Sequence, residues 1–168
     1  MGMIPEEFFE TFVLGNYVDC QQNSCCIRRA FNAAVSASHL ADHYFKFNKK
    51  YAQSKVESFK TIGDFVAYLS KNTSGCFQDI RSISNAYKHL YEDPRNAAYS
   101  TISSTGAIES IYFVGKNMEV KMLEKVWPKE TKPHNIESKV FFTRKDDKRI
   151  EFLPTLDRVI KFWEKLLI

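Results

Sequence analysis

The chain of 168 residues is long enough to form one domain around its own hydrophobic core, without disulfides or metals to hold it together. Hydrophobic residues make up 44% of the sequence and aromatic residues 14%, a composition that excludes a disordered chain. No apolar stretch reaches the roughly 18 residues of a membrane span, and the acidic start lacks the basic region of a signal peptide. We therefore expect a single cytoplasmic domain that does not contact a membrane.

The positive charge of the chain is small and lies toward its C-terminus. The formal net charge is +4; residues 1–115 hold 11 basic and 11 acidic side chains, and residues 116–168 hold 13 and 9. This excess permits contact with a polyanion such as RNA, but it is smaller than the basic stripe of a dedicated nucleic-acid binder. Charge alone favours an ordinary solvated surface, so function has to be sought in particular residues.

The four cysteines have a spacing that matches no zinc-binding pattern. They are Cys20, Cys25, Cys26 and Cys76. The adjacent pair falls within a predicted helix, and we expect all four to be reduced, partly buried thiols.

The first half of the chain predicts four helices. A short one opens at Pro5 and ends at Gly15-Asn16. A long one, free of proline and glycine and rich in alanine, runs from about Val18 to Lys50. Thr61 caps a third helix that continues to about Lys71, and a fourth covers about Cys76–Tyr91, with Tyr87 on its apolar side.

The second half changes its hydrophobic period from 3.6 to 2. Asp93-Pro94 breaks the fourth helix and 100–106 reads as a loop. Alternating apolar residues then predict short antiparallel strands in 108–114, 118–122, 139–144 and 149–153, with a turn at 145–148. Pro154 begins a closing helix with a clean apolar stripe.

These elements predict an α+β, mainly α fold. We expect a helical bundle of about five helices with a small antiparallel strand meander inserted before the C-terminal helix. The single domain 1–168 would consist of a helical part at 1–92, the meander at 108–153 and the closing helix at 154–168.

A first polar stripe lies on the long helix. His39 and His43 are four residues apart, so they stand one above the other and, with Asp42, can share a metal or a phosphate. A metal needs further ligands, for which Asp42, His89 and His134 are candidates, and the spacing demands none of them. Surface histidines, one of them paired with a carboxylate, are the other interpretation of this pattern.

A second polar stripe lies on the fourth helix. Arg81, Asn85 and His89 are spaced by four and climb one face over roughly 12 Å, with Lys88 beside them. A histidine can exchange a proton near neutral pH, an asparagine can orient it, and the two cations can hold a phosphate. The set suits metal-free cleavage of RNA, plain phosphate binding, or a structural network at the end of a helix.

The segments Ser38-His39-Leu40-Ala41-Asp42-His43 and Asp79–His89 resemble those of a group of small bacterial helical proteins, and more distantly the HEPN superfamily. The resemblance implies a metal-independent ribonuclease of a toxin-antitoxin or phage-defence system that acts as a dimer. In that superfamily the motif is an arginine, usually followed by a polar residue, and then a histidine after four to six intervening residues. Arg81 with Ser82 fits this motif, whereas seven residues separate Arg81 from His89.

The leading hypothesis is therefore a HEPN-like protein that binds RNA or a nucleotide and cleaves RNA without a cofactor. His89, Arg81 and Asn85 would be catalytic, and Lys88, His39 and His43 would bind the substrate. The competing hypothesis is a non-catalytic interaction or accessory module, in which the same stripes contact a second copy or a protein partner. A third is a helical-bundle metal protein that uses His39, His43 and His89.

Overall fold

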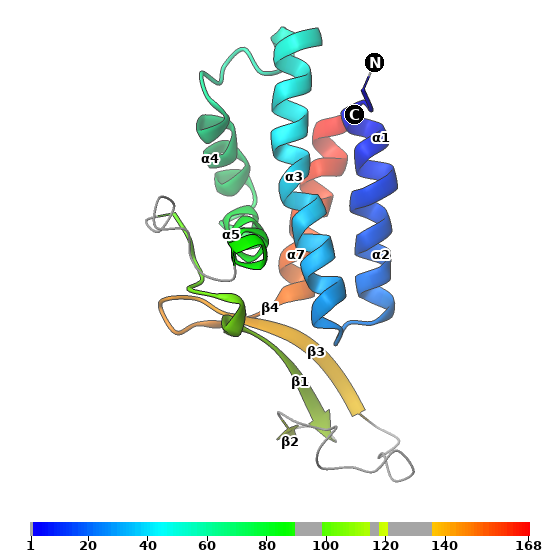
Figure 1. Cartoon of the computed structure of the whole chain (residues 1–168), viewed down its shortest axis with the longest axis vertical. Coiled ribbons are helices and arrows are strands. Elements are labelled where there is room, and N and C mark those ends of the chain that lie inside the picture. The colour runs from blue at the N-terminus through cyan, green and yellow to red at the C-terminus, as the bar shows by residue number, and fades with distance from the viewer. Residues whose placement is uncertain (1, 90–98, 115–117, 121–135) are drawn as a thin grey trace.

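The computed structural model describes residues 2–89, 99–114, 118–120 and 136–168. It confirms the mainly α class, because a helical bundle is joined to a small antiparallel sheet that precedes the last helix in the chain (Figure 1). Within the described ranges, no helix combines the length and the apolar character that crossing a bilayer requires.

The N-terminal helix is longer than predicted. Helix α1 (Pro5–Phe8) runs into a π-helical stretch (Phe9–Leu14), which continues directly as α2 (Gly15–Gln22). The expected end at Gly15-Asn16 is wrong, since Gly15 has right-handed helical angles of φ −56° and ψ −52°. A glycine inside a helix costs about 1 kcal/mol relative to alanine. Burial of apolar side chains along the same helix outweighs this cost, and they include Phe9, Val13 and Cys20.

The long helix predicted for Val18–Lys50 is interrupted, and this prediction is also wrong. Asn23 leaves the helical conformation, and α3 (Ile27–Tyr51) begins after a turn. Ser24 in that turn is bound to strand β3 (Ile136–Thr143): its hydroxyl donates to the carbonyl oxygen of Ser138, and its own carbonyl oxygen accepts from the amide of Val140. A contact with a distant strand thus fixes a break that no proline or glycine marks.

The cysteine pair lies in this break and not inside a helix. Cys25 belongs to the turn, and Cys26 immediately precedes α3. All four cysteines are free thiols, with Cys20 buried and the others half-buried. Burial raises the pKa of Cys20 to about 11, so this thiol is protonated and unreactive at neutral pH.

The remaining helices largely follow the sequence prediction. Helix α4 spans Ile62–Asn72, and the Thr61 hydroxyl accepts from the amide of Asp64 while the Asp64 carboxylate accepts from the amide of Thr61. Helix α5 is described over Cys76–His89. Helix α7 (Phe152–Leu167) begins two residues before Pro154, and Glu151 is the residue that precedes it.

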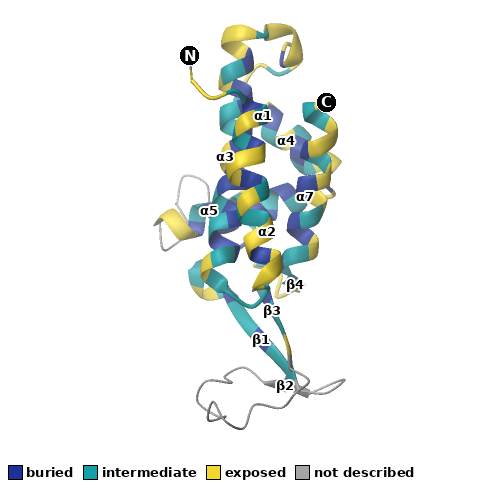
Figure 2. Ribbon diagram, turned by 90° about the vertical axis from the view of Figure 1, so that its right-hand side faces the viewer, coloured by how far each residue is buried: buried dark blue, intermediate teal, exposed yellow. Residues whose placement is uncertain are grey.

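The core lies where α3 meets α4, α5 and α7. Helix α3 occupies the centre of the bundle, with α2 and α7 along it (Figure 1), and buried residues concentrate on the helix faces that point inward (Figure 2). Aromatic rings join three of these helices: Tyr44 stands 5.4 Å from Phe65 and 5.7 Å from Trp163. Tyr87 was expected on the apolar side of α5; its ring stacks on the buried Phe31, but the residue is 48% exposed and is not part of the core.

The sheet has the order β2-β1-β3-β4, and every neighbouring pair is antiparallel. Its other strands are β1 (Ile108–Val114), β2 (Met118–Val120) and β4 (Arg149–Glu151). The small antiparallel sheet is confirmed, but its strands do not form the simple meander that was expected, because β3 pairs with β1 and not with β2. Strands β1 and β3 extend from one end of the bundle (Figures 1 and 2). The predicted break at Asp93-Pro94 and the residue Met122 lie outside the described residues.

Candidate functional site

The two polar stripes predicted on separate helices meet across the contact between α3 and α5. Arg81 Nη1 lies 3.3 Å from Asp42 Oδ2 and donates a hydrogen bond to it. About two turns further along α5, Lys88 Nζ donates to His39 Nε2. These four residues, His39, Asp42, Arg81 and Lys88, form one cluster, which we call the α3–α5 cluster.

The geometry fixes the protonation state of His39. A lysine ammonium only donates hydrogen bonds, so His39 Nε2 must be the unprotonated nitrogen and the ring proton sits on Nδ1. Burial lowers the pKa of His39 below its ordinary value, and the nearby charge of Lys88 lowers it further. A neutral imidazole at neutral pH is a proton acceptor.

The two cations of the cluster are only partly neutralised by Asp42. Burial lowers the pKa of Lys88, as does the charge of Arg81, while Asp42 acts in the opposite direction. The Arg81 side chain is 24% exposed and that of Asp42 is 35% exposed, so water reaches both. Arg81 is half-buried and Lys88 is exposed, and these two cations beside a single carboxylate form a surface that favours a further anionic group.

His43 is held differently from His39. Its Nε2 donates to the carbonyl oxygen of Met3 at 2.8 Å, and its ring stacks on Phe8 with centroids 5.1 Å apart. His43 therefore faces the N-terminal helix. An open pocket of about 380 Å³ lies between α1 and α3; it is lined by Phe8, His39, Asp42, His43 and Lys46.

The other predicted residues lie on α5. Asn85 is half-buried, one turn after Arg81. His89 is the last described residue of α5, and its side chain lies outside the described residues. The helical spacing of Arg81, Asn85 and His89 is therefore confirmed, and the catalytic role of His89 stays a prediction.

The described residues contain no group of three or more His, Cys, Asp or Glu side chains that could hold a metal. His39 Nε2 faces the ammonium of Lys88, and His43 Nε2 faces a carbonyl oxygen. The further ligands considered from the sequence, the side chains of His89 and His134, lie outside the described part.

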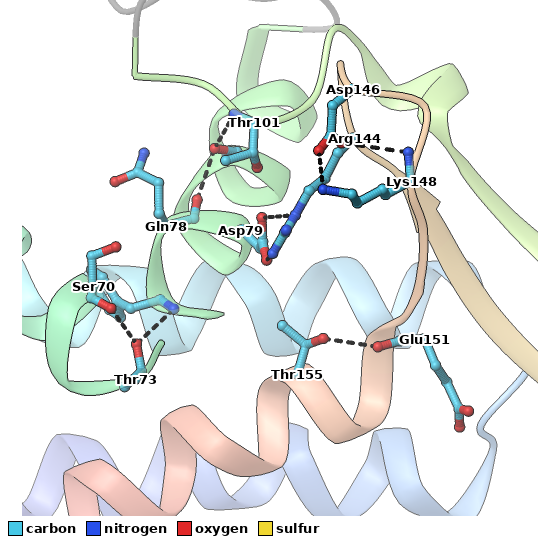
Figure 3. Close-up of polar contacts among 12 residues, drawn as sticks. Ser70, Thr73, Gln78, Asp79, Thr101, Arg144, Asp146, Lys148, Glu151 and Thr155 are labelled. Carbon is cyan, nitrogen blue, oxygen red and sulfur yellow. Dashed lines mark hydrogen bonds and ion pairs between the residues drawn. The ribbon is translucent and has the colours of Figure 1, made fainter. Parts of the chain in front are cut away.

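Sequence reasoning missed a buried ion pair beside a second pocket. The Asp79 side chain is 0% exposed and accepts from both Nε and Nη2 of Arg144, which follows β3 (Figure 3). The pocket next to this pair has a volume of about 440 Å³ and is lined in part by Ser74, Thr101 and Lys145. One feature of the sequence could have indicated the buried ion pair: Asp79 is a single carboxylate on the apolar side of α5, at helical spacing from Cys76 and Ile83.

Comparison with known proteins gives no family assignment. The chain matches no family model, no curated protein and no solved structure.

Proposed function

We propose that the protein binds the phosphate of RNA or of a nucleotide at the α3–α5 cluster and cleaves RNA there without a metal. The observation that carries the proposal is the contact between Lys88 and His39, with Arg81 and Asp42 alongside. It brings a neutral histidine and two cations to one place, which are the groups that phosphate-ester cleavage requires.

In the proposed reaction Arg81 and Lys88 bind the phosphate and stabilise the charge that builds up on it. A histidine accepts the proton of the 2′-hydroxyl, and the 2′-oxygen forms a bond to the adjacent phosphorus. The bond from phosphorus to the 5′-oxygen then breaks, and that oxygen takes up a proton from water or from a protonated histidine. The products are a 2′,3′-cyclic phosphate and a 5′-hydroxyl end.

Two histidines are candidates for the proton acceptor. His89 has this role in the HEPN-like hypothesis, because it shares its helix face with Arg81 and Asn85. His39 is the other candidate, supported by its contact with Lys88 and by its lowered pKa. In the hypothesis drawn from the sequence His39 binds the substrate, and we propose proton acceptance as an alternative role.

The test is cleavage of labelled single-stranded RNA in EDTA, with the ends of the products identified. We expect cyclic phosphate and 5′-hydroxyl ends, and a loss of rate of about 10²- to 10⁴-fold in either His89→Ala or His39→Gln. Lys88→Gln should weaken RNA binding and reduce its dependence on salt. Lys60→Gln removes an exposed lysine outside the cluster and should leave the rate unchanged. Equal rates in the wild type and both histidine variants would refute the proposal.

A non-catalytic interaction module is the second candidate, favoured by the exposed ring of Tyr87 beside the cluster. Tyr87 is 48% exposed and precedes Lys88 in α5, and large exposed aromatic rings are typical of protein contacts. Sedimentation velocity tests this function. Tyr87→Ser should dissociate a homodimer, whereas Tyr51→Ser, at a tyrosine that is 49% exposed on α3, should leave it intact.

A further inference from the structure

The pocket between α1 and α3 adjoins the α3–α5 cluster directly. His39 and Asp42 line the pocket, and each also contacts a cation of α5: His39 binds Lys88, and Asp42 binds Arg81. His39, Asp42, His43 and Lys46 follow one face of α3, which extends over about 10 Å at 1.5 Å per residue. A ligand held by the two cations at one end therefore has an adjacent hollow along the same helix face.

Part of the wall of this hollow is aromatic, because Phe8 and His43 line it. The rings of Phe8 and His43 stack on each other at 27° from parallel, and the ring centroid of Phe12 lies 5.2 Å from that of Phe8. The hydrogen bond to Met3 fixes the orientation of the His43 ring before any ligand arrives. Aromatic side chains next to cations are the groups with which proteins hold single-stranded nucleic acid, because every base offers a flat face for stacking.

The backbone at Phe8 supports a role in binding. The π-helical stretch begins at the next residue, Phe9. Such turns are rare, since their hydrogen bonding is less favourable than that of an α-helix, and they occur frequently at functional sites.

We propose that the pocket lined by Phe8 and His43 holds the base of the nucleotide whose phosphate lies at Lys88 and Arg81. This inference rests on the proposed function, because it assumes that the cluster binds the phosphate. The base stacks on the aromatic wall, and Asp42 and Lys46 face its polar edge. The substrate is then a nucleotide with an unpaired base, such as single-stranded RNA, and not a duplex, in which the base is already stacked and paired.

Calorimetric titration of the wild-type protein separates this inference from the proposed function. The probes are the four nucleoside 5′-monophosphates and ribose 5-phosphate, which carries the same phosphate and sugar without a base. We expect at least one monophosphate to bind about tenfold or more tightly than ribose 5-phosphate, from the stacking of one base. Equal binding of all five probes would refute the base pocket and leave phosphate binding intact. Absence of binding by every probe would refute both.

Variants at Phe8 assign the gain to stacking. Phe8→Leu keeps an apolar side chain and removes the ring, so monophosphate binding should fall to the level of ribose 5-phosphate, whose own affinity should not change. Phe8→Tyr keeps the ring and should keep the gain. A gain that persists in Phe8→Leu would overturn the inference.

Magnetic resonance of the wild-type protein gives a readout that needs no variant. A monophosphate should shift the ring resonances of both His39 and His43, whereas ribose 5-phosphate should shift those of His39 alone. A tight monophosphate that leaves His43 unshifted would overturn the inference.

Discussion

The carboxylate of Asp79, which is 0% exposed, accepts two hydrogen bonds from the guanidinium of Arg144, 65 residues further along the chain. The pair joins α5 of the bundle to the turn that follows β3. Arg144 retains 28% of its side-chain exposure, so the two charges meet at the boundary between the core and the solvent.

Arg144→Met should lower the free energy of unfolding by about 3–5 kcal/mol, because it leaves the buried Asp79 without a compensating charge. Urea denaturation followed by circular dichroism measures this loss. The double variant Asp79→Leu with Arg144→Met should recover part of the stability, since it removes both charges. Lys148→Gln, in a pair on the same turn whose lysine is 69% exposed, is the control and should change little.

Gly15→Ala should raise the free energy of unfolding by about 0.5–1 kcal/mol. Gly15 has helical angles, and a Cβ atom placed on it meets nothing within 4 Å, so alanine gains helix propensity without a clash. Gly75→Ala is the matched opposite case, because Gly75 has a φ of +84° that alanine adopts only with strain. Thermal unfolding distinguishes the two signs; a destabilising Gly15→Ala would mean that the helix ends at this residue, as the sequence first indicated.

Lys88→Gln should raise the pKa of His39 toward its ordinary value, because the charge of Lys88 is one of the causes that lower it. Burial is the larger cause and persists, so the rise should be partial. Titration of the histidine ring resonances from pH 4 to 8 measures the change. An unchanged pKa would mean that the ammonium does not lie against the ring.

The same lowered pKa makes stability depend on pH. The folded state binds fewer protons at His39 than the unfolded state does between the folded pKa and about 6.5. The contribution of His39 to stability is therefore present above pH 6.5 and is lost as the pH falls toward the folded pKa. Unfolding midpoints in urea at pH 5.5 and 7.5 should show a smaller difference in His39→Gln than in the wild type.

Thr61→Ala should cost about 1 kcal/mol of stability, since it removes the hydroxyl that accepts from the amide of Asp64 at the start of α4. Thr61→Ser keeps the hydroxyl and is the control. Chemical denaturation of the two variants should separate their midpoints.

Local chemistry made most of the elements predictable. The Thr61 cap and the apolar stripe of the closing helix are each encoded within a few residues, and both predictions are confirmed. The break before α3 was missed because the contacts that hold it come from Ser138 and Val140, more than 100 residues away. The burial of Asp79 was missed for the same reason, because its partner is distant in the sequence.

The residues of the candidate site were predicted from the sequence, but the contacts between those of α3 and those of α5 were not. Helical spacing put His39 with Asp42 on one face and Arg81 with Asn85 on another. Which members touch depends on how α3 and α5 cross, and this crossing selects Lys88 as the partner of His39. Phe8 carries no spacing signal, because the helix that bears it reaches α3 only through the tertiary fold.

The π-helical stretch lets a single helix serve two neighbours. Upstream of it, Phe8 stacks on His43 of α3; downstream, the hydroxyl of Tyr17 donates to Asp157 of α7 at 2.7 Å. Deleting one codon within Phe9–Leu14 would return this segment toward the α-helical period and turn one half against the other by about 100°, the angle of one α-helical residue. The segment would still form a helix after such a deletion, but it could no longer make both the contact with His43 and the contact with Asp157. A single deletion can therefore change the rotation of one half of this helix relative to the other, without any substitution in the α3–α5 cluster.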